Sequence, residues 1–207
     1  ADARQVPDWL PRKARAAARR AAERHDLTVS FDDAALPDVW RLYAISMRRL
    51  GSINYSYGFF EALIAETPGR HLVQTVRADG RPVAGLITLL GRGVAMPYFV
   101  GTVTRGAVYG LSNYLYCKAI ERCVEMGCTT FDFGRSRRDN AGGVDFKRFH
   151  GFTPQPLAYE RFVPAGGRDA RLSPSHPRFA MPRRLWPWLP LAVTTRLGAW
   201  LARSIPG

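Results

Sequence analysis

Residues 128–159 read CTTFDFGRSRRDNAGGVDFKRFHGFTPQPLAY, and this stretch decides the fold that we assign to the whole chain. It predicts a short strand over residues 129–133 that stops at Gly134 and opens into a polar loop. A short helix follows, ends at Gly151 and carries Asp145, Lys147, Arg148 and His150. An apolar strand over residues 156–162 closes the stretch. Because glycines and charges gather where a strand ends, we expect the chemistry of the protein there.

The residues before this stretch predict the scaffold that carries it. Residues 27–31 alternate as in a strand, Asp32 or Asp33 caps a helix that ends at Gly51, and another helix follows over residues 59–64. The first helix has a continuous apolar stripe, formed by Leu36, Val39, Trp40, Tyr43, Met47 and Leu50. From residue 70 the period changes to two, and Asp79-Gly80 predicts a hairpin turn. Residues 93–103 add a third antiparallel strand, and Ser112 caps a helix over residues 113–127.

The order of these elements defines the fold class. A strand, two helices, three antiparallel strands, a helix, a strand, a short helix and a final strand follow one another without an internal repeat. This order predicts an α/β (α+β) domain, with a mixed, mostly antiparallel sheet and helices on both faces. It resembles the order of elements in N-acyltransferases of the GNAT type.

Charge divides the 207-residue chain into three parts. The net charge is +13, of which residues 1–25 hold +4, residues 164–207 hold +6, and the middle holds only +3. We therefore predict a basic helical arm (1–25), a GNAT-like acyltransferase domain (26–163) and a basic tail rich in Pro and Trp (164–207). Polyanions, either anionic lipid headgroups or nucleic acid, are natural partners of such ends. The alternative is that the excess of Arg over Lys reflects codon usage alone.

Each end of the chain allows two interpretations. Residues 8–25 predict one helix with Asp8 as its N-cap, basic on one side and alanine-rich on the other. It is either a solvated helix whose alanine face lies on the domain, or an arm that grips phosphates such as those of tRNA. The tail mixes Trp, Leu and Arg, and its longest uncharged run is too short to span a bilayer. It is either a membrane-interfacial segment or a tail packed on the domain or on a missing partner domain.

Three cysteines, Cys117, Cys123 and Cys128, have neither a disulfide framework nor zinc-ligand spacing. We interpret them as reduced core residues and expect a cytoplasmic protein, with a peripheral position on the inner membrane as an open alternative. The sequence contains no run of 18 or more apolar residues, so it predicts no transmembrane helix. The chain starts at Ala1 in a charged segment, which favours a piece cut from a longer protein.

At FDFGRS…FKRFHGFTPQPLAY the sequence resembles the FemAB family, and more narrowly the FemAB-like proteins associated with exosortase/PEP-CTERM systems. The likeness extends to PRKAR…RR, MRRLGS…YGFFEAL, DGRPVAGLITL and the terminal SIPG. Members of the family have two GNAT-like domains, so the resemblance implies a C-terminal half whose N-terminal half is missing here. It also implies transfer of an acyl or aminoacyl group to an amine, near exopolysaccharide or cell-envelope assembly. FemAB enzymes proper attach an amino acid from aminoacyl-tRNA to a peptidoglycan precursor.

The donor stays open between acyl-CoA and aminoacyl-tRNA. A GNAT enzyme that uses acetyl-CoA normally carries a Gln/Arg-x-x-Gly-x-Gly/Ala loop before its central helix, where backbone N–H groups hold the pyrophosphate. Here residues 104–113 read TRGAVYGLSN, which lacks that spacing. The departure favours a FemAB-type donor or another activated acyl group, and we name no certain cofactor and no metal.

Acyl transfer to an amine needs a neutral amine, close approach and stabilisation of the negative charge on the carbonyl oxygen. Lys147 holds the position of the family's Phe-Lys motif, and its ammonium would offset that charge. Asp132 would orient Lys147 or accept a proton. We predict an anionic substrate, bound by Arg135, Ser136, Arg137, Asn113, Asn54 and Tyr55.

Each candidate also has a structural interpretation. Asp132 would cap a loop or pair with Arg135, Lys147 would be an exposed helix residue, and the aromatic loop at Tyr55 would only pack. No Ser-His-Asp or Cys-His order is present, so a covalent acyl-enzyme is not expected. The alternative function is a non-catalytic GNAT-like module that binds an anionic polymer or a membrane surface in an envelope-assembly complex.

Overall fold

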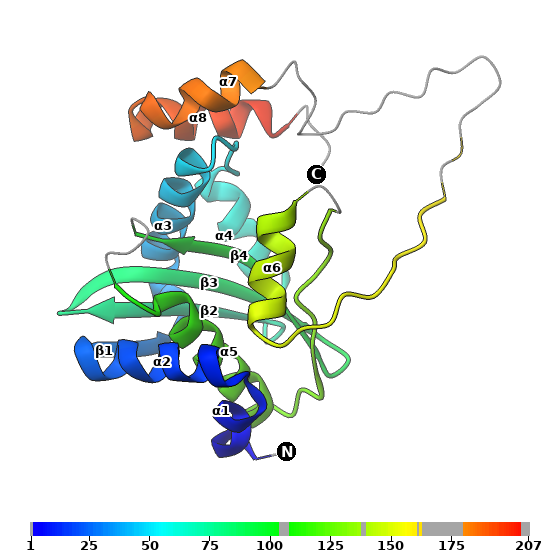
Figure 1. Cartoon of the computed structure of the whole chain (residues 1–207). Helices are drawn as coiled ribbons and strands as arrows, with labels where there is room; N and C mark the ends of the chain where they lie inside the picture. Colours follow the sequence, from blue (N-terminus) through cyan, green and yellow to red (C-terminus); the bar gives the residue numbers. More distant parts are fainter. Residues whose placement is uncertain (1, 104–107, 138–139, 161, 163–179, 204–207) are drawn as a thin grey trace.

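A computed structural model describes residues 2–103, 108–137, 140–160, 162 and 180–203, and it contains one five-stranded sheet in the order β1-β2-β3-β4-β5. Four strands are antiparallel neighbours (Figure 1): β1 (Leu27–Phe31), β2 (His71–Ala78), β3 (Arg81–Gly91) and β4 (Val94–Thr102). The short β5 (Thr130–Phe131) runs parallel to β4 and pairs with it at Val94 and Ala95. The chain after β5 therefore leaves the sheet while β4 continues.

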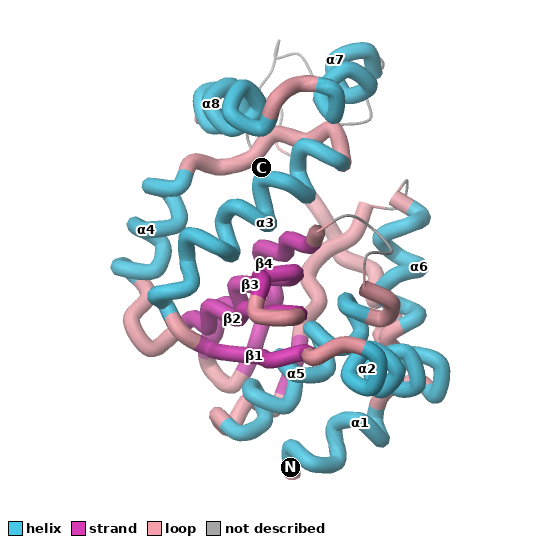
Figure 2. Tube along the Cα trace, turned by 90° about the vertical axis from the view of Figure 1, so that its left-hand side faces the viewer, coloured by secondary structure: helices cyan, strands magenta, loops and turns pink. Residues whose placement is uncertain are grey.

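Helices cover both faces of this sheet (Figure 2). On one face lie α3 (Leu36–Arg49) and α4 (Tyr57–Glu66), and on the other lie α5 (Leu111–Glu125) and α2 (Arg12–Arg24). Central strand β3 shows why both faces need cover, because Leu86 and Ile87 point to opposite sides and both are fully buried. The remaining helical segments are η1 (Ala3–Gln5), α1 (Val6–Trp9), η2 (Asp33–Ala35), α6 (Ala141–Phe149), α7 (Ala180–Leu185), η4 (Trp186–Trp188) and α8 (Leu191–Leu201).

The predicted stripe of the helix after Asp32 is confirmed over most of its length, because Leu36, Val39 and Tyr43 lie in the core between α3, α4 and the sheet. It is wrong at its end, since Leu50 is the C-cap of α3 and is 58% exposed. The helix approaches the sheet so closely that β4 needs a glycine. A Cβ on Gly101 would lie 2.1 Å from the backbone nitrogen of Tyr43. Packing at this interface therefore depends on a missing side chain.

The predicted N-terminal helix is wrong in one respect: it is broken in two. Pro11 biases the residue before it away from helical geometry, and Leu10 is extended (φ −77°, ψ 144°), so α1 and α2 are separate. Asp8 is not an N-cap; its carboxylate accepts a hydrogen bond from Arg15 at 2.7 Å. One of the two interpretations expected the alanine face of this helix to lie on the domain. The alanine face of α2 does pack on α5, with Ala18 and Ala21 in the core.

The predicted final strand over residues 156–162 is also wrong within the described residues. Residues 156–160 and 162 form no strand, and their side chains are exposed. A strand forms only beside a partner strand, and the described sheet ends at β5, so these residues have no strand to pair with. Similarly, Gly110 rather than Ser112 occupies the N-cap of α5, with a positive φ of 74° that suits glycine.

The last described segment, α7–η4–α8, lies over the C-terminal end of α3 (Figure 1). Arg48 donates a hydrogen bond to the carbonyl oxygen of Leu189 at 3.0 Å, and buried Asn54 donates one to Thr195 at 3.5 Å. This part of the tail is therefore packed on the domain. No helix in the described part of the chain has the length and apolarity needed to cross a membrane.

Candidate active site

The loop after β5 is held by its own backbone and by one carboxylate. The backbone N–H of Asp132 donates to the carbonyl oxygen of Ala95 in β4 at 2.8 Å, one residue beyond the end of β5. The Asp132 side chain then accepts a hydrogen bond from the N–H of Gly134 at 2.8 Å, where φ is 68°. Asp132 thus caps the turn, which is the structural interpretation of this residue, and its side chain belongs to an exposed residue.

Lys147, in the last turn of α6, binds the same loop. Its Nζ donates to the carbonyl oxygens of Gly134 at 2.7 Å and Arg135 at 3.2 Å. An ammonium has three donors, so these two bonds leave one N–H for a ligand. Partial burial lowers the pKa of Lys147 below its ordinary value, and the charge of Asp132 opposes that shift. The structure therefore brings the two predicted catalytic residues to one loop, as a cation beside a carboxylate.

An aromatic cluster fixes α6 beneath this loop. Phe133 packs edge-on against Phe152, with ring centroids 4.4 Å apart, and Tyr116 of α5 contacts both Phe133 and Phe146. Phe133 and Phe146 also belong to the apolar shell around the α5 core. Because these rings pack on the domain core, the position of Lys147 is set by α5 and the sheet rather than by the loop alone.

Asn113 lies in the first turn of α5 and is buried, with its amide bonded to a histidine. Its Nδ2 lies 3.1 Å from Nε2 of His150, and Nδ1 of His150 lies 2.8 Å from the carbonyl oxygen of Phe146. A carbonyl only accepts, so Nδ1 carries the proton and Nε2 accepts from the amide. Burial accordingly lowers the pKa of His150. The structure thus gives Asn113 a positioning contact at the end of α6.

We expect this buried histidine to make the domain sensitive to mild acid. The folded-state pKa lies below the unfolded value near 6.5, so the unfolded chain takes up the proton first as the pH falls. The stability that the neutral imidazole of His150 contributes is fully present above about pH 6.5. It is lost as the pH falls from that value to the lowered pKa, by up to about 1.4 kcal/mol per pH unit. Urea unfolding at pH 7.5 and 5.5 measures it. His150→Gln should lower stability at pH 7.5 but lose less on acidification than wild type; an equal loss would contradict the assignment.

Arg135 is fully exposed and contacts a tyrosine beyond α6. A hydrogen bond with Tyr159 raises the pKa of Arg135, and nearby Tyr98 of β4 adds a smaller effect in the same direction. Ser136 and Arg137 are exposed on the same loop, and Arg138 lies outside the described residues. Sequence reasoning named neither tyrosine as a neighbour of Arg135. Their exposure, 59% for Tyr98 and 70% for Tyr159, is visible only in the structure, so the sequence offered no signal for them.

Asn54 and Tyr55 lie away from this loop, on the α3–α4 side of the sheet. The Asn54 amide donates to the carbonyl oxygens of Tyr55 and Thr195, and its side chain is 1% exposed. Tyr55 stacks on Phe59 with centroids 4.6 Å apart. The structure gives both residues packing roles, and it does not bring them to Lys147. Their predicted substrate contact stays a prediction.

Two hollows among the described residues lie beside α5, and Lys147 lines neither of them. One of about 550 Å³ lies between α2 and α5, and one of about 460 Å³ lies between α1, α5, β5 and the turn after α6. Lys147 is partly buried, and Asp132 and Arg135 of the loop beside it are exposed. No group of three or more His, Cys, Asp or Glu residues with metal-binding geometry occurs among the described residues.

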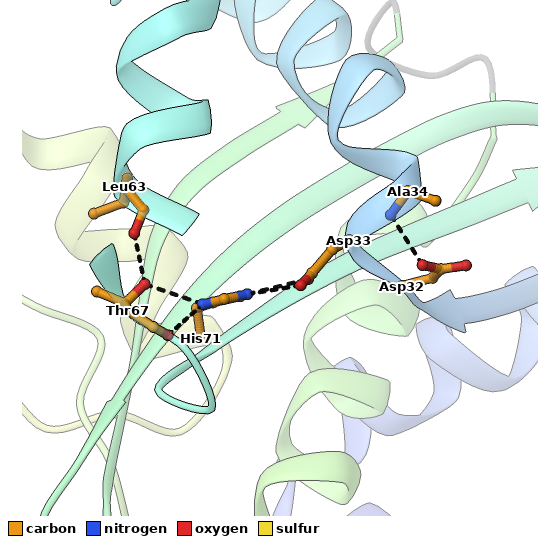
Figure 3. A network of polar contacts seen from close by, with 6 residues as sticks. All are labelled: Asp32, Asp33, Ala34, Leu63, Thr67 and His71. Atoms are coloured by element: carbon orange, nitrogen blue, oxygen red, sulfur yellow. Dashed lines mark hydrogen bonds and ion pairs between the residues drawn. The ribbon is translucent and has the colours of Figure 1, made fainter. Parts of the chain in front are cut away.

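A hydroxyl–imidazole–carboxylate chain does occur elsewhere, at the start of β2 (Figure 3). Nε2 of His71 lies 3.1 Å from Asp33, and Nδ1 faces Thr67. However, the Thr67 hydroxyl donates to the carbonyl oxygen of Leu63 at 2.7 Å, away from the imidazole. The Thr67 hydroxyl therefore has no base to activate it. The contacts among Asp33, His71 and Thr67 instead connect η2, α4 and β2.

A mixed sheet with a parallel fifth strand, helices on both faces and a cationic loop after that strand define an N-acyltransferase class of domain. The chain belongs to the acetyltransferase (GNAT) domain family, which it matches over residues 11–148. The predicted fold is thereby confirmed, and so is the predicted enzyme class. Enzymes of this family use acyl-CoA as the donor.

Solved structures with the same fold include FemX, with a TM-score of 0.65 and 14% identity, covering 73% of this chain and 56% of FemX. The chain thus spans little more than half the length of FemX. The ribosomal-protein-S18-alanine N-acetyltransferase from Escherichia coli has a TM-score of 0.50 and 18% identity, covering 69% and 87%. An aminoglycoside acetyltransferase from an uncultured soil metagenomic sample has a TM-score of 0.51 and 16% identity, covering 66% and 96%. No curated protein is significantly similar in sequence.

Proposed function

We propose that this chain is an acyl- or aminoacyltransferase domain that acts on an amine, with the loop after β5 and Lys147 as its reactive surface. The observation that carries the proposal is the ammonium of Lys147, held by two loop carbonyls in a GNAT domain, with one donor left for a ligand. A fixed cation beside a glycine turn is suited to an oxygen that becomes negative during the reaction.

The charges around the loop fit the steps of aminolysis. The donor carbonyl oxygen would accept the third N–H of Lys147 as its charge develops. The carboxylate of exposed Asp132 would take the proton that the attacking amine loses, and would return it to the alcohol or thiol that leaves as the donor's C–O or C–S bond breaks. Arg135, already oriented by Tyr159, would bind a phosphate or carboxylate of the substrate in bidentate fashion. Each of these groups acts from the surface, so a second partner or domain would have to exclude water.

The donor is proposed to be an aminoacyl ester or another activated acyl group, with acyl-CoA as the competing donor. Residues 104–113 lack the expected pyrophosphate loop. In addition, α2 lies against the start of α5: a Cβ on Gly110 would lie 2.2 Å from the carbonyl oxygen of Ala17. A helix N-terminus that is partly covered offers fewer free N–H groups to a pyrophosphate.

As part of the same proposal, we place the reaction in cell-envelope or exopolysaccharide metabolism. The support for this role is the resemblance of residues 131–159 to FemAB-like proteins. The chain covers 56% of FemX, so we propose that an N-terminal GNAT-like half completes the active protein.

The experiment that tests the function offers the chain two donors and one amine. Acetyl-CoA and an aminoacyl-tRNA are each incubated with a lysine-containing peptide, and the mass of the peptide is measured against a heat-denatured control. A gain of one acyl or aminoacyl group supports the proposal and identifies the donor. Unchanged peptide with both donors, when the N-terminal half is also supplied, would contradict it.

A further inference from the structure

The C-terminal cap, defined here as residues 180–203 with α7, η4 and α8, has an inner and an outer face. Trp186, Thr194 and Gly198 are buried against the domain. The contact is tight, since a Cβ on Gly198 would lie 2.5 Å from Oδ1 of Asn54. Together with the bonds from Arg48 and Asn54, this packing makes the cap a fixed platform on the end of α3.

The outer face of the cap is apolar. Residues of α8 at spacings of three and four form one outward stripe, because the inward Thr194 and Gly198 fix the orientation of the helix. Trp188 is 85% exposed and Trp200 66% exposed, which is unusual because tryptophan is highly buried on average. The exposed apolar side chains of the cap are Met181, Leu185, Trp188, Val193, Leu197 and Trp200. A patch of this composition indicates a partner.

The charge of the cap identifies the chemistry of that partner. Residues 180–203 contain four arginines and no acidic residue, and all four are exposed. Arg196 lies within the outward stripe of α8, one residue from Leu197. Arginine binds phosphate, Trp prefers the headgroup level of a bilayer, and aliphatic side chains enter the acyl region below. Nucleic acid has no apolar layer in which the aliphatic side chains could be buried. The combination of arginine, tryptophan and aliphatic residues therefore favours an anionic lipid surface.

We propose that the cap docks this domain on an anionic phospholipid bilayer, with Trp188 and Trp200 at the headgroup level and the arginines on lipid phosphates. The eleven residues of α8 are too few to span a bilayer, so the helix lies in the interface. Figures 1 and 2 both place the cap and the N-terminal end of α6 toward the same end of the molecule. Docking therefore turns the loop before α6 toward the membrane surface.

Vesicle co-sedimentation of the full chain tests this proposal. The vesicles contain either phosphatidylcholine alone or phosphatidylcholine with about 30 mol% phosphatidylglycerol, which makes them anionic. We expect at least about tenfold tighter binding to the anionic vesicles, weakened by salt. Trp188→Ser with Trp200→Ser should reduce the affinity at least about tenfold, since the two indole rings are the largest apolar surfaces that the interface would bury.

The chain offers matched controls for both side-chain types. Trp9→Ser removes an exposed tryptophan of α1 outside the cap, and it should leave binding unchanged. Arg184→Glu with Arg196→Glu should abolish the preference for anionic vesicles, whereas Arg12→Glu with Arg20→Glu on α2 should not. Equal binding by the double Trp variant, or loss caused by the α2 variant alone, would overturn the proposal. So would self-association that the cap variants abolish while lipid binding persists, or tighter binding to RNA than to lipid through the cap.

Discussion

Lys147→Ala is expected to lower the rate of acyl transfer by about 10²–10³-fold while the domain stays folded. The ammonium holds two loop carbonyls and has one remaining donor, so its removal takes away both a fixed positive charge and the support of the loop. A loss of this size equals about 3–4 kcal/mol of transition-state stabilisation. The measurement is the single-turnover rate with the donor that the binding and transfer experiment identifies, together with thermal unfolding.

Arg148→Ala is the matched control, because it removes one exposed cation from the neighbouring position of α6. It should keep at least half of the wild-type rate. A purely structural role of Lys147 predicts that Lys147→Ala and Lys147→Met lose stability and activity together. A catalytic charge predicts instead that Lys147→Ala recovers part of its rate when a small alkylammonium ion is added. A Lys147→Ala protein with the rate of wild type would remove this residue from the mechanism.

The pH dependence provides a second readout for the same residue. Burial lowers the pKa of Lys147, and the charged form is the one that stabilises an oxyanion. As the pH rises, the ammonium loses its proton and the rate should fall. This decline should begin before the pH reaches the ordinary lysine pKa of about 10.4. Lys147→Arg should move this decline to higher pH, because guanidinium stays charged.

Local patterns predicted the scaffold well because its elements have strong periods and turn residues. The hairpin is one case: Asp79 and Gly80 both have positive φ, of 50° and 74°, as the dipeptide predicts. The apolar stripe of α3 is another, because fourteen residues repeat the helical spacing often enough to distinguish it from the alternation of a strand. The strand predicted for residues 156–162 was wrong within the described residues because a strand needs a partner, and no strand of the described sheet pairs with this segment.

The candidate site was predictable only where its residues are near in sequence. Asp132, Gly134 and Lys147 belong to one loop–helix segment, and the structure joins them directly. Asn113 is different, because its amide meets His150 through the packing of α5 against α6, at a separation of 37 positions. Asn54 likewise meets the C-terminal cap across 141 positions. Pairings over such separations follow from the assembled core and leave no periodic trace in the sequence.

Gly101→Ala is expected to destabilise the domain more than any other single methyl addition to the sheet face under α3. The added Cβ would lie 2.1 Å from the backbone nitrogen and 2.2 Å from the carbonyl carbon at the Leu42–Tyr43 peptide. Backbone atoms in a helix cannot rotate away as a side-chain end can, so α3 as a whole must move outward. Overpacking of this kind costs about 3 kcal/mol or more, which is a large part of the stability of an ordinary domain. Thermal unfolding should show a midpoint lowered by roughly 6 °C or more.

Gly91→Ala separates this effect from the cost of adding a side chain to a strand. Gly91 lies at the end of β3, has no atom within 4 Å of its ideal Cβ and does not have a positive φ. The variant should change stability by about 0.5 kcal/mol or less. Gly85→Ala, whose Cβ would lie 3.0 Å from Val39, should fall between the two. If Gly101→Ala unfolds like Gly91→Ala, then α3 is not seated against β4 as described, and the aromatic packing of Tyr43 against Phe99 would have to be reassigned with it.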